Sequence, residues 1–206
     1  MSTTADRTTE QAGVHDGRHA RRERNRLAVV DAMLALYGEG HLDPSADEIA
    51  ERAGLSPRSL FRYFDDLDDL VRVAISRQHE RLQPLACLDV SVDAPLADRV
   101  GRLVAQRLRL FDKIASVGIV SRVRAPFQPL IACELALSRS VLRRQVEQLF
   151  APELEARDKA RAASAIAAID VLTSFEALQL LRNDQHLTRL QIQATLTDSL
   201  HRLLEG

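Results

Sequence analysis

The stretch Ser45–Phe64, SADEIAERAGLSPRSLFRYF, decides the fold because it specifies two short helices joined by a tight turn. Ser45, followed three residues later by Glu48, forms a capping box, which predicts that a helix begins there. Gly54 can adopt the positive φ that ends this helix and turns the chain sharply. Ser56 then caps a second helix. The stretch therefore predicts a helix-turn-helix.

The second helix has two chemically different sides. At about 100° per residue, Leu60 and Phe64 point inward together, whereas Arg58 and Arg62 lie nearly opposite them. Two guanidinium groups without a neighbouring acid suit phosphate oxygens and guanine edges. The alternative is an ordinary helical hairpin whose arginines are only solvated. The pattern favours DNA binding through Ser45, Ser56, Pro57, Arg58, Ser59, Phe61, Arg62 and Tyr63.

The motif has a specific set of small, apolar and aromatic residues: Ile49-Ala50, Ala53-Gly54-Leu55-Ser56, Ser59-Leu60-Phe61, Tyr63-Phe64 and Leu70. With these residues the segment resembles the tetracycline-repressor-like (TetR) family of bacterial transcription regulators. The sequence departs from the family at two positions. Phe61 stands where the family often has tyrosine, and Leu67 stands where it usually has lysine, so two phosphate contacts are missing.

Composition places the chain among ordinary globular proteins, since 46% of its 206 residues are hydrophobic and 28% are charged. No apolar run approaches the roughly 20 residues that span a bilayer, and residues 1–17 lack an apolar signal core. We therefore expect a cytoplasmic protein without membrane partners. Cys87 and Cys133 are expected to be reduced thiols.

Charge is distributed unevenly around the motif. Residues 38–70 hold nine acidic residues and three arginines, but most of these acids are predicted at helix starts, where they complement the helix dipole. The segment Arg18–Arg26 holds five arginines and one acid, Glu23. It is predicted either to contact the DNA backbone or to be a solvated helix end.

The hydrophobic pattern predicts an all-α protein with three parts. Residues 1–20 are expected to form a disordered, basic-tending arm, and residues 21–82 a three-helix DNA-binding domain containing the motif at 45–64. Residues 83–206 are expected to form a helical bundle for ligand binding and dimerisation. Within the DNA-binding domain the first helix should cover about Arg21–Tyr37, and the helix after the motif should end near Leu82, before Pro84.

Five helices are expected in the second half. Their predicted positions are 95–111, 115–123, 126–150, 153–183 and from Thr188 onward. The run Ala162–Leu181 is apolar on all sides, so it must be covered on all sides.

The last helix adds an apolar stripe at i, i+4, i+8 and i+11, beginning at Ile192. This stripe and the run Ala162–Leu181 predict a homodimer with a shared four-helix bundle, as the family resemblance also implies. A monomer with its own closed bundle is the alternative. The predicted dimerisation residues are Phe175, Leu178, Ile192, Leu196, Leu200 and Leu203.

The resemblance further implies a small-molecule effector that binds an apolar pocket in the second domain. Arg107 lies within the apolar face of its helix, and Glu134 interrupts another. Such residues either form salt bridges at a helix seam, reach to water, or orient a polar ligand group. The predicted ligand-binding residues are Arg107, Phe111, Phe127 and Glu134.

Catalysis finds little support in the sequence. The six histidines show no metal-ligand spacing, and no glycine-rich phosphate loop occurs. We therefore expect no enzyme activity, no cofactor and no metal. The sequence predicts a DNA-binding transcriptional regulator, a repressor released from its double-stranded operator by the effector. The alternative is a helical adaptor or ligand-binding bundle without sequence-specific DNA binding.

Overall fold

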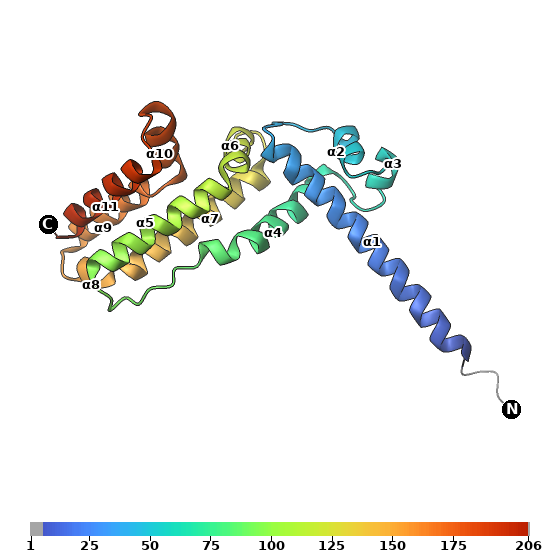
Figure 1. Cartoon of the computed structure of the whole chain (residues 1–206), viewed down its shortest axis with the longest axis horizontal. Coiled ribbons are helices and arrows are strands. Elements are labelled where there is room, and N and C mark those ends of the chain that lie inside the picture. The colour runs from blue at the N-terminus through green and yellow to red at the C-terminus, as the bar shows by residue number, and fades with distance from the viewer. Residues whose placement is uncertain (1–5, 206) are drawn as a thin grey trace. The chain divides into compact units, whose positions relative to one another are not determined.

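The computed structural model describes residues 6–205, and it describes their side chains from residue 20 onward. Every regular element in this described part is helical, which confirms the predicted all-α class. The packing divides the chain into two compact units, with the boundary after His79 (Figure 1).

The first unit contains α1 (Asp6–Gly38), α2 (Ala46–Arg52), α3 (Pro57–Leu60) and most of α4 (Leu67–Ala86). α2 packs against both α1 and α3. The buried apolar side chains recur at helical spacing, so each helix turns one face inward. They include Val29, Val30, Met33, Leu36, Tyr37, Ile49, Ala50, Leu60, Phe64, Leu70, Val71 and Ala74.

Two helix boundaries in this unit differ from the prediction. α1 begins at Asp6, well before the expected start near Arg21, because residues 6–38 contain no proline, and each glycine there costs only about 1 kcal/mol relative to alanine. Residues 1–5 of the predicted arm lie outside the described residues. α4 continues past Leu82 to Ala86, with Pro84 inside it. Pro84 lies in the last turn, so few backbone hydrogen bonds are lost.

The second unit is a bundle of longer and shorter helices. Its elements are α5 (Leu96–Lys113), α6 (Ala115–Arg124), α7 (Pro129–Leu149), α8 (Ala151–Glu155), α9 (Lys159–Leu172), α10 (Phe175–Gln179), the π-helix η1 (Leu180–Asp184) and α11 (Arg189–Glu205). α5 packs against α11, and α7 packs against α6 and α9. The core side chains of α5 are Val100, Leu103, Val104, Leu108, Leu110 and Phe111.

The helix predicted over 153–183 is in fact interrupted. Asp158 caps α9 by accepting the Arg161 N–H at 2.9 Å, and Ser174 caps α10 by accepting the Ala177 N–H at 3.1 Å. The Thr173 hydroxyl donates to the Ile169 carbonyl at 2.8 Å. Short polar side chains bond to backbone groups that a continuous helix would use, so the chain breaks where they occur. Similarly, the helix expected from Pro126 begins at Pro129.

Arginine side chains hold the helices of this unit together. Arg99, which is almost fully buried, donates to both carboxylate oxygens of Glu153 and to the Leu149 carbonyl at 2.8 Å. Glu176 accepts from Arg122 and Arg139, while Asp112 accepts from Arg182 and Arg189. These contacts join segments that are far apart in the sequence.

Phe175 joins three helices of this unit. Its ring meets Phe111 edge to face, with centroids 5.6 Å apart, and the Arg122 guanidinium carbon lies 4.0 Å from its centroid. A methyl group at Gly118 would lie 2.8 Å from this ring, so only glycine permits this close approach.

Within the described residues, no single helix is long and apolar enough to cross a membrane. α9 reaches that length and composition only together with α10 and η1, across a bend of 46°.

Candidate functional site

The turn between α2 and α3 is built as the sequence predicts. The Ser45 N–H donates to the Glu48 carboxylate at 2.7 Å, and the Glu48 N–H donates to the Ser45 hydroxyl at 3.2 Å. The backbone hydrogen bond from Ser45 is the main reason that the pKa of Glu48 is lowered. Gly54 has φ +70°, and the Leu55 N–H reaches back to the Ala50 carbonyl at 2.9 Å. This pattern closes the end of α2 and directs the chain into α3.

α3 is shorter than the helix expected up to Phe64. Ser56 caps it by accepting the Ser59 N–H, and the two hydroxyls lie 2.9 Å apart. After Leu60 the hydrogen bonds tighten, since the Tyr63 N–H donates to the Leu60 carbonyl at 2.9 Å. The inward anchor is nevertheless as predicted, because Leu60 and Phe64 are both fully buried.

α1 fixes the end of this segment from the other side. Asn25 donates its side-chain amide to the Tyr63 hydroxyl at 3.0 Å. The Arg26 guanidinium carbon lies 5.3 Å from the centroid of the Phe64 ring, which is a cation–π contact. The segment Leu60–Phe64 is therefore held by side chains on its inner surface and at its end.

The outer surface of α3 and the following turn carries Arg58, Phe61 and Arg62, all exposed. Among the residues with described side chains, the side chains of Arg58 and Arg62 have no hydrogen-bond or ion-pair partner. Four other predicted contact residues are already engaged: Ser45 and Ser56 cap helices, the Ser59 hydroxyl bonds to that of Ser56, and Tyr63 accepts from Asn25. Two exposed guanidinium groups without a partner among the described side chains are suited to bind an anion.

The acidic residues around this surface are partly neutralised by local contacts. Glu39 forms a two-bond ion pair with Arg52, at 2.6 and 2.8 Å, and this pair lowers the pKa of Glu39. Asp66 accepts the Asp69 N–H at 2.7 Å at the start of α4. These acids therefore cap helices or pair with Arg52, and among the described side chains none pairs with Arg58 or Arg62.

The basic segment of α1 separates into two kinds of arginine. Arg21, Arg22 and Arg24 are exposed, as a backbone-contacting surface requires. Arg26 is half-buried against Phe64, so part of its role is structural. The side chain of Arg18 lies outside the described residues.

The four predicted ligand-binding residues are not brought together. Arg107 and Phe111 are buried on α5, but Phe127 is 83% exposed and Glu134 accepts from Ser138 one turn along α7. The structure thus separates the buried pair on α5 from the other two residues.

Arg107 is the centre of a buried polar cluster in the second unit. Its guanidinium donates to the side chains of Gln106 and Gln145, at 2.5 and 2.9 Å, and to the Leu142 carbonyl at 2.9 Å. Its Nε has no partner among the described residues. Burial lowers the pKa of Arg107 to about 10, and the charge of Asp170 opposes this shift only in part.

Two members of this cluster were missed from the sequence. Gln106 donates to the Leu85 and Ala86 carbonyls at 3.0 Å, and Gln145 donates to the Ala86 carbonyl at 2.7 Å. Together they bind the carbonyls at the end of α4. Their only sequence signal is a polar residue next to an apolar helical face, which is common on surfaces.

The predicted dimerisation residues lie mostly inside the core of their own chain. Five of the six side chains are buried within their own chain, where they form the core between α5, α9, α10 and α11: Phe175, Leu178, Ile192, Leu196 and Leu200. The stripe of α11 faces its own domain because α5 packs directly against that helix. Only Leu203 remains partly accessible.

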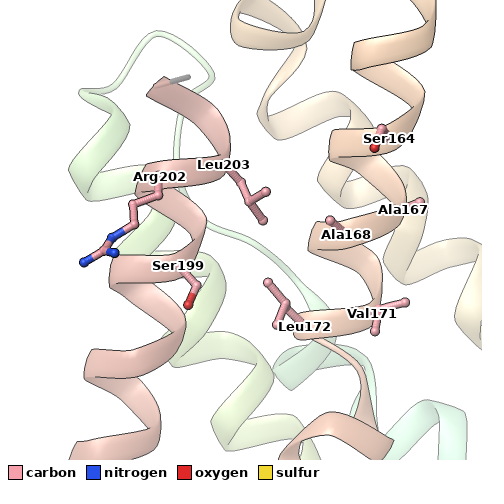
Figure 2. Close-up of a pocket in the computed structure, with 8 residues that line it drawn as sticks. All are labelled: Ser164, Ala167, Ala168, Val171, Leu172, Ser199, Arg202 and Leu203. Atoms are coloured by element: carbon pink, nitrogen blue, oxygen red, sulfur yellow. The ribbon is translucent and has the colours of Figure 1, made fainter.

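A different surface of α9 and α11 is open and mostly apolar (Figure 2). Leu172 and Leu203 point into the space between the two helices, and Val171 is 66% exposed. The α9 side of this trough is lined partly by small residues, Ser164, Ala167 and Ala168. Its lining is Ser164, Ala167, Ala168, Val171, Leu172, Ser199, Arg202 and Leu203.

Comparison with known proteins identifies the first unit most directly. Residues 30–74 match the family model described as bacterial regulatory proteins, tetR family. The fold is similar to the crystal structure of a tetR-family transcriptional regulator from Streptomyces coelicolor, with a TM-score of 0.65 and 20% sequence identity. This match covers 86% of the present chain and 81% of that chain. No curated protein matches the sequence significantly.

Proposed function

We propose that this chain, a member of the tetR family of bacterial regulatory proteins and hence a DNA-binding transcription regulator, is a repressor that a small molecule releases from its operator. The observation that carries DNA reading by α3 is that Arg58 and Arg62, on an anchored surface, have no side-chain partner in the described part of the chain. In this proposal the two guanidinium groups contact guanine edges or phosphates in the major groove.

The other predicted DNA-binding residues have supporting roles in the proposal. Ser56, Pro57 and Ser59 fix the start of α3, and Ser45 fixes the start of α2. Tyr63 accepts a hydrogen bond from Asn25, and its hydroxyl proton remains available to a phosphate oxygen. These groups set the position of the helix, while Arg58 and Arg62 carry most of the sequence preference.

Selection from a pool of random DNA duplexes tests the proposal. The full chain should enrich one sequence and bind it far more tightly than scrambled DNA of equal length, by a factor on the order of 10³ or more at physiological salt. An unenriched pool would favour the helical adaptor and overturn the DNA-reading proposal.

The second part of the proposal is a homodimer through the open face of α9 and α11. The apolar stripe of α11 is covered by other helices of the same chain, whereas the adjacent trough leaves Val171 and Leu203 accessible. Alanine and serine side chains on α9 allow a second helix to approach closely. A second copy related by a two-fold axis would cover this apolar face with the same face.

Two substitutions separate this interface from the one predicted by the sequence. Val171→Arg should give folded monomers, because it places a charge in the proposed contact. Leu200→Arg should unfold the second unit, since Leu200 is fully buried. Leu137→Arg on the exposed face of α7 is the matched control and should remain dimeric. Sedimentation at low micromolar concentration distinguishes these outcomes; a dimeric Val171→Arg protein would place the interface elsewhere.

The third part concerns the effector. The buried Arg107 guanidinium, with its unbonded Nε, supports recognition of a polar or negatively charged effector group on α5 beside Phe111. Arg107→Met should retain DNA binding and dimerisation but lose release by effector. A compound library screened for DNA release measures this. A variant that still responds fully would exclude Arg107 from effector recognition.

We also propose that the protein acts in the cytoplasm, where its DNA partner lies, and that it is not an enzyme. Among residues with described side chains, no group of three His, Cys, Asp or Glu is placed to hold a metal ion. In this proposal the protein acts by occupying its DNA operator.

A further inference from the structure

Phe61 is unusual because it places a large apolar side chain on the proposed DNA-reading surface. Its ring is 52% exposed, on the same short segment as the exposed Arg58 and Arg62. The interior below it is filled by Leu60 and Phe64, so the ring cannot turn inward. The backbone at Phe61 is fixed as well, since its N–H donates to the Pro57 carbonyl at 3.4 Å.

The ring is therefore an exposed apolar group on a segment that also carries two exposed cations. It has no hydrogen-bonding atom, so it reads neither the donors nor the acceptors of a base edge. The apolar group that a major groove offers at base level is the C5-methyl of thymine. A phenyl ring loses little conformational entropy on contact, because only two torsions are restricted.

We infer that Phe61 is a specificity-determining residue that selects thymine at one operator position through contact with its C5-methyl group. This inference rests on the proposed function, because it requires α3 to lie in the major groove. Arg58 and Arg62 would then supply charge and hydrogen bonds, and Phe61 would supply a methyl preference at a neighbouring base. Ser59 does not compete for this role, because its hydroxyl is engaged with Ser56.

Deoxyuridine isolates this contact because it differs from thymidine only by the missing methyl group. The DNA selected by the full chain is resynthesised with one thymine at a time replaced by uracil, and binding is followed by fluorescence anisotropy. Loss of one buried methyl group should weaken binding about fourfold at one position in each half-site. Replacing any other thymine should leave the binding affinity unchanged.

The variants then assign the effect to the ring. Phe61→Ala should bind thymine and uracil duplexes equally, and Phe61→Gln, which keeps the bulk but removes the apolar surface, should do the same. Phe61→Leu should retain part of the preference. Leu190→Ala removes a comparably exposed apolar side chain from α11 and should keep the full wild-type preference.

The outcomes separate the inference from the proposed function. If no DNA sequence is enriched at all, DNA reading itself fails and the inference fails with it. If a sequence is enriched but no thymine is sensitive to uracil, only the methyl contact is overturned. Phe61→Ala could also weaken binding to thymine and uracil duplexes by the same factor, so that the variant still prefers thymine as the wild type does. That result would place the ring against deoxyribose and would also overturn the methyl contact.

Discussion

The outer surface of α3 and the helix seams of the second unit both depend on arginine, but they use it in opposite ways. At the seams, Arg99, Arg122 and Arg182 each pair with a carboxylate on a distant segment. On α3 and the following turn, Arg58 and Arg62 have no carboxylate partner among the described side chains. An arginine that stabilises the fold therefore differs from one that binds an outside anion in its partner and not in its residue type.

The largest expected effect is at the most buried seam. Arg99→Met removes the hydrogen bonds to Glu153 and to the Leu149 carbonyl, and it leaves a partly buried carboxylate unpaired. The free energy of unfolding should fall by about 3–5 kcal/mol. Denaturant titration measures this loss. Arg143→Met, which removes an exposed pair with Glu147 along one helix, is the control and should cost about 0.5 kcal/mol or less. If both variants lost the same free energy of unfolding, the buried seam arginine would stabilise the fold no more than an exposed one.

For Arg58 and Arg62 we expect a loss of DNA binding without a loss of stability. Arg58→Ala or Arg62→Ala should each lose about 1–3 kcal/mol of specific DNA binding. Stability should stay within about 0.5 kcal/mol, because no folded contact is removed. Arg52→Ala in α2 is the control: Arg52 is already paired with Glu39, so sequence preference should persist. An Arg62→Ala protein with unchanged affinity and preference would refute its assignment.

A smaller effect is expected from the exposed arginines of α1. Replacing Arg21, Arg22 and Arg24 with glutamine should flatten the plot of log affinity against log salt by up to about 0.9 per lost phosphate contact. Arg26 is left unchanged because it stacks on Phe64. Arg26→Gln alone should instead reduce stability by roughly 0.5–1 kcal/mol. A salt slope identical to that of wild type would mean that the three exposed arginines are only solvated.

Sequence predicts local structure well here because the decisive contacts are local. The capping box of Ser45 and Glu48, the turn at Gly54 and the cap at Ser56 each depend on residues within a few positions. The buried pair Leu60 and Phe64 follows from helical spacing in the same way. These features were enough to predict the helix-turn-helix.

The features that sequence missed depend on what packs against what. Periodicity shows that Ile192, Leu196 and Leu200 lie on a buried face, but it does not show whether that face meets its own domain or a second copy. The structure assigns them to their own domain. The cluster of Gln106, Arg107 and Gln145 likewise joins α5 to α7, and no local pattern links them.

The smallest expected effect concerns acid stability at the seam around Glu176. Burial alone would raise the pKa of Glu176, but the hydrogen bonds from Arg122 and Arg139 outweigh it and lower the pKa to about 2. A carboxyl group whose folded pKa is depressed stabilises the protein above its unfolded pKa, near 4.5, and loses this contribution as the pH falls toward 2. Glu176 is about half exposed, so solvent screening should limit the contribution to about 1 kcal/mol or less.

The test compares wild type with Glu176→Gln by denaturant unfolding between pH 6 and pH 3. The stability difference between them should be largest at pH 6 and should shrink steadily toward pH 3, because only the wild type has a carboxylate to protonate. At about 1 M salt the difference at pH 6 should also shrink, since the seam is partly open to solvent. A difference that stays constant with pH would show that Glu176 contributes through packing and not through charge. In that case the pairing of this exposed seam would matter no more than that of a surface ion pair, and the contrast with α3 would rest on the buried Arg99 alone.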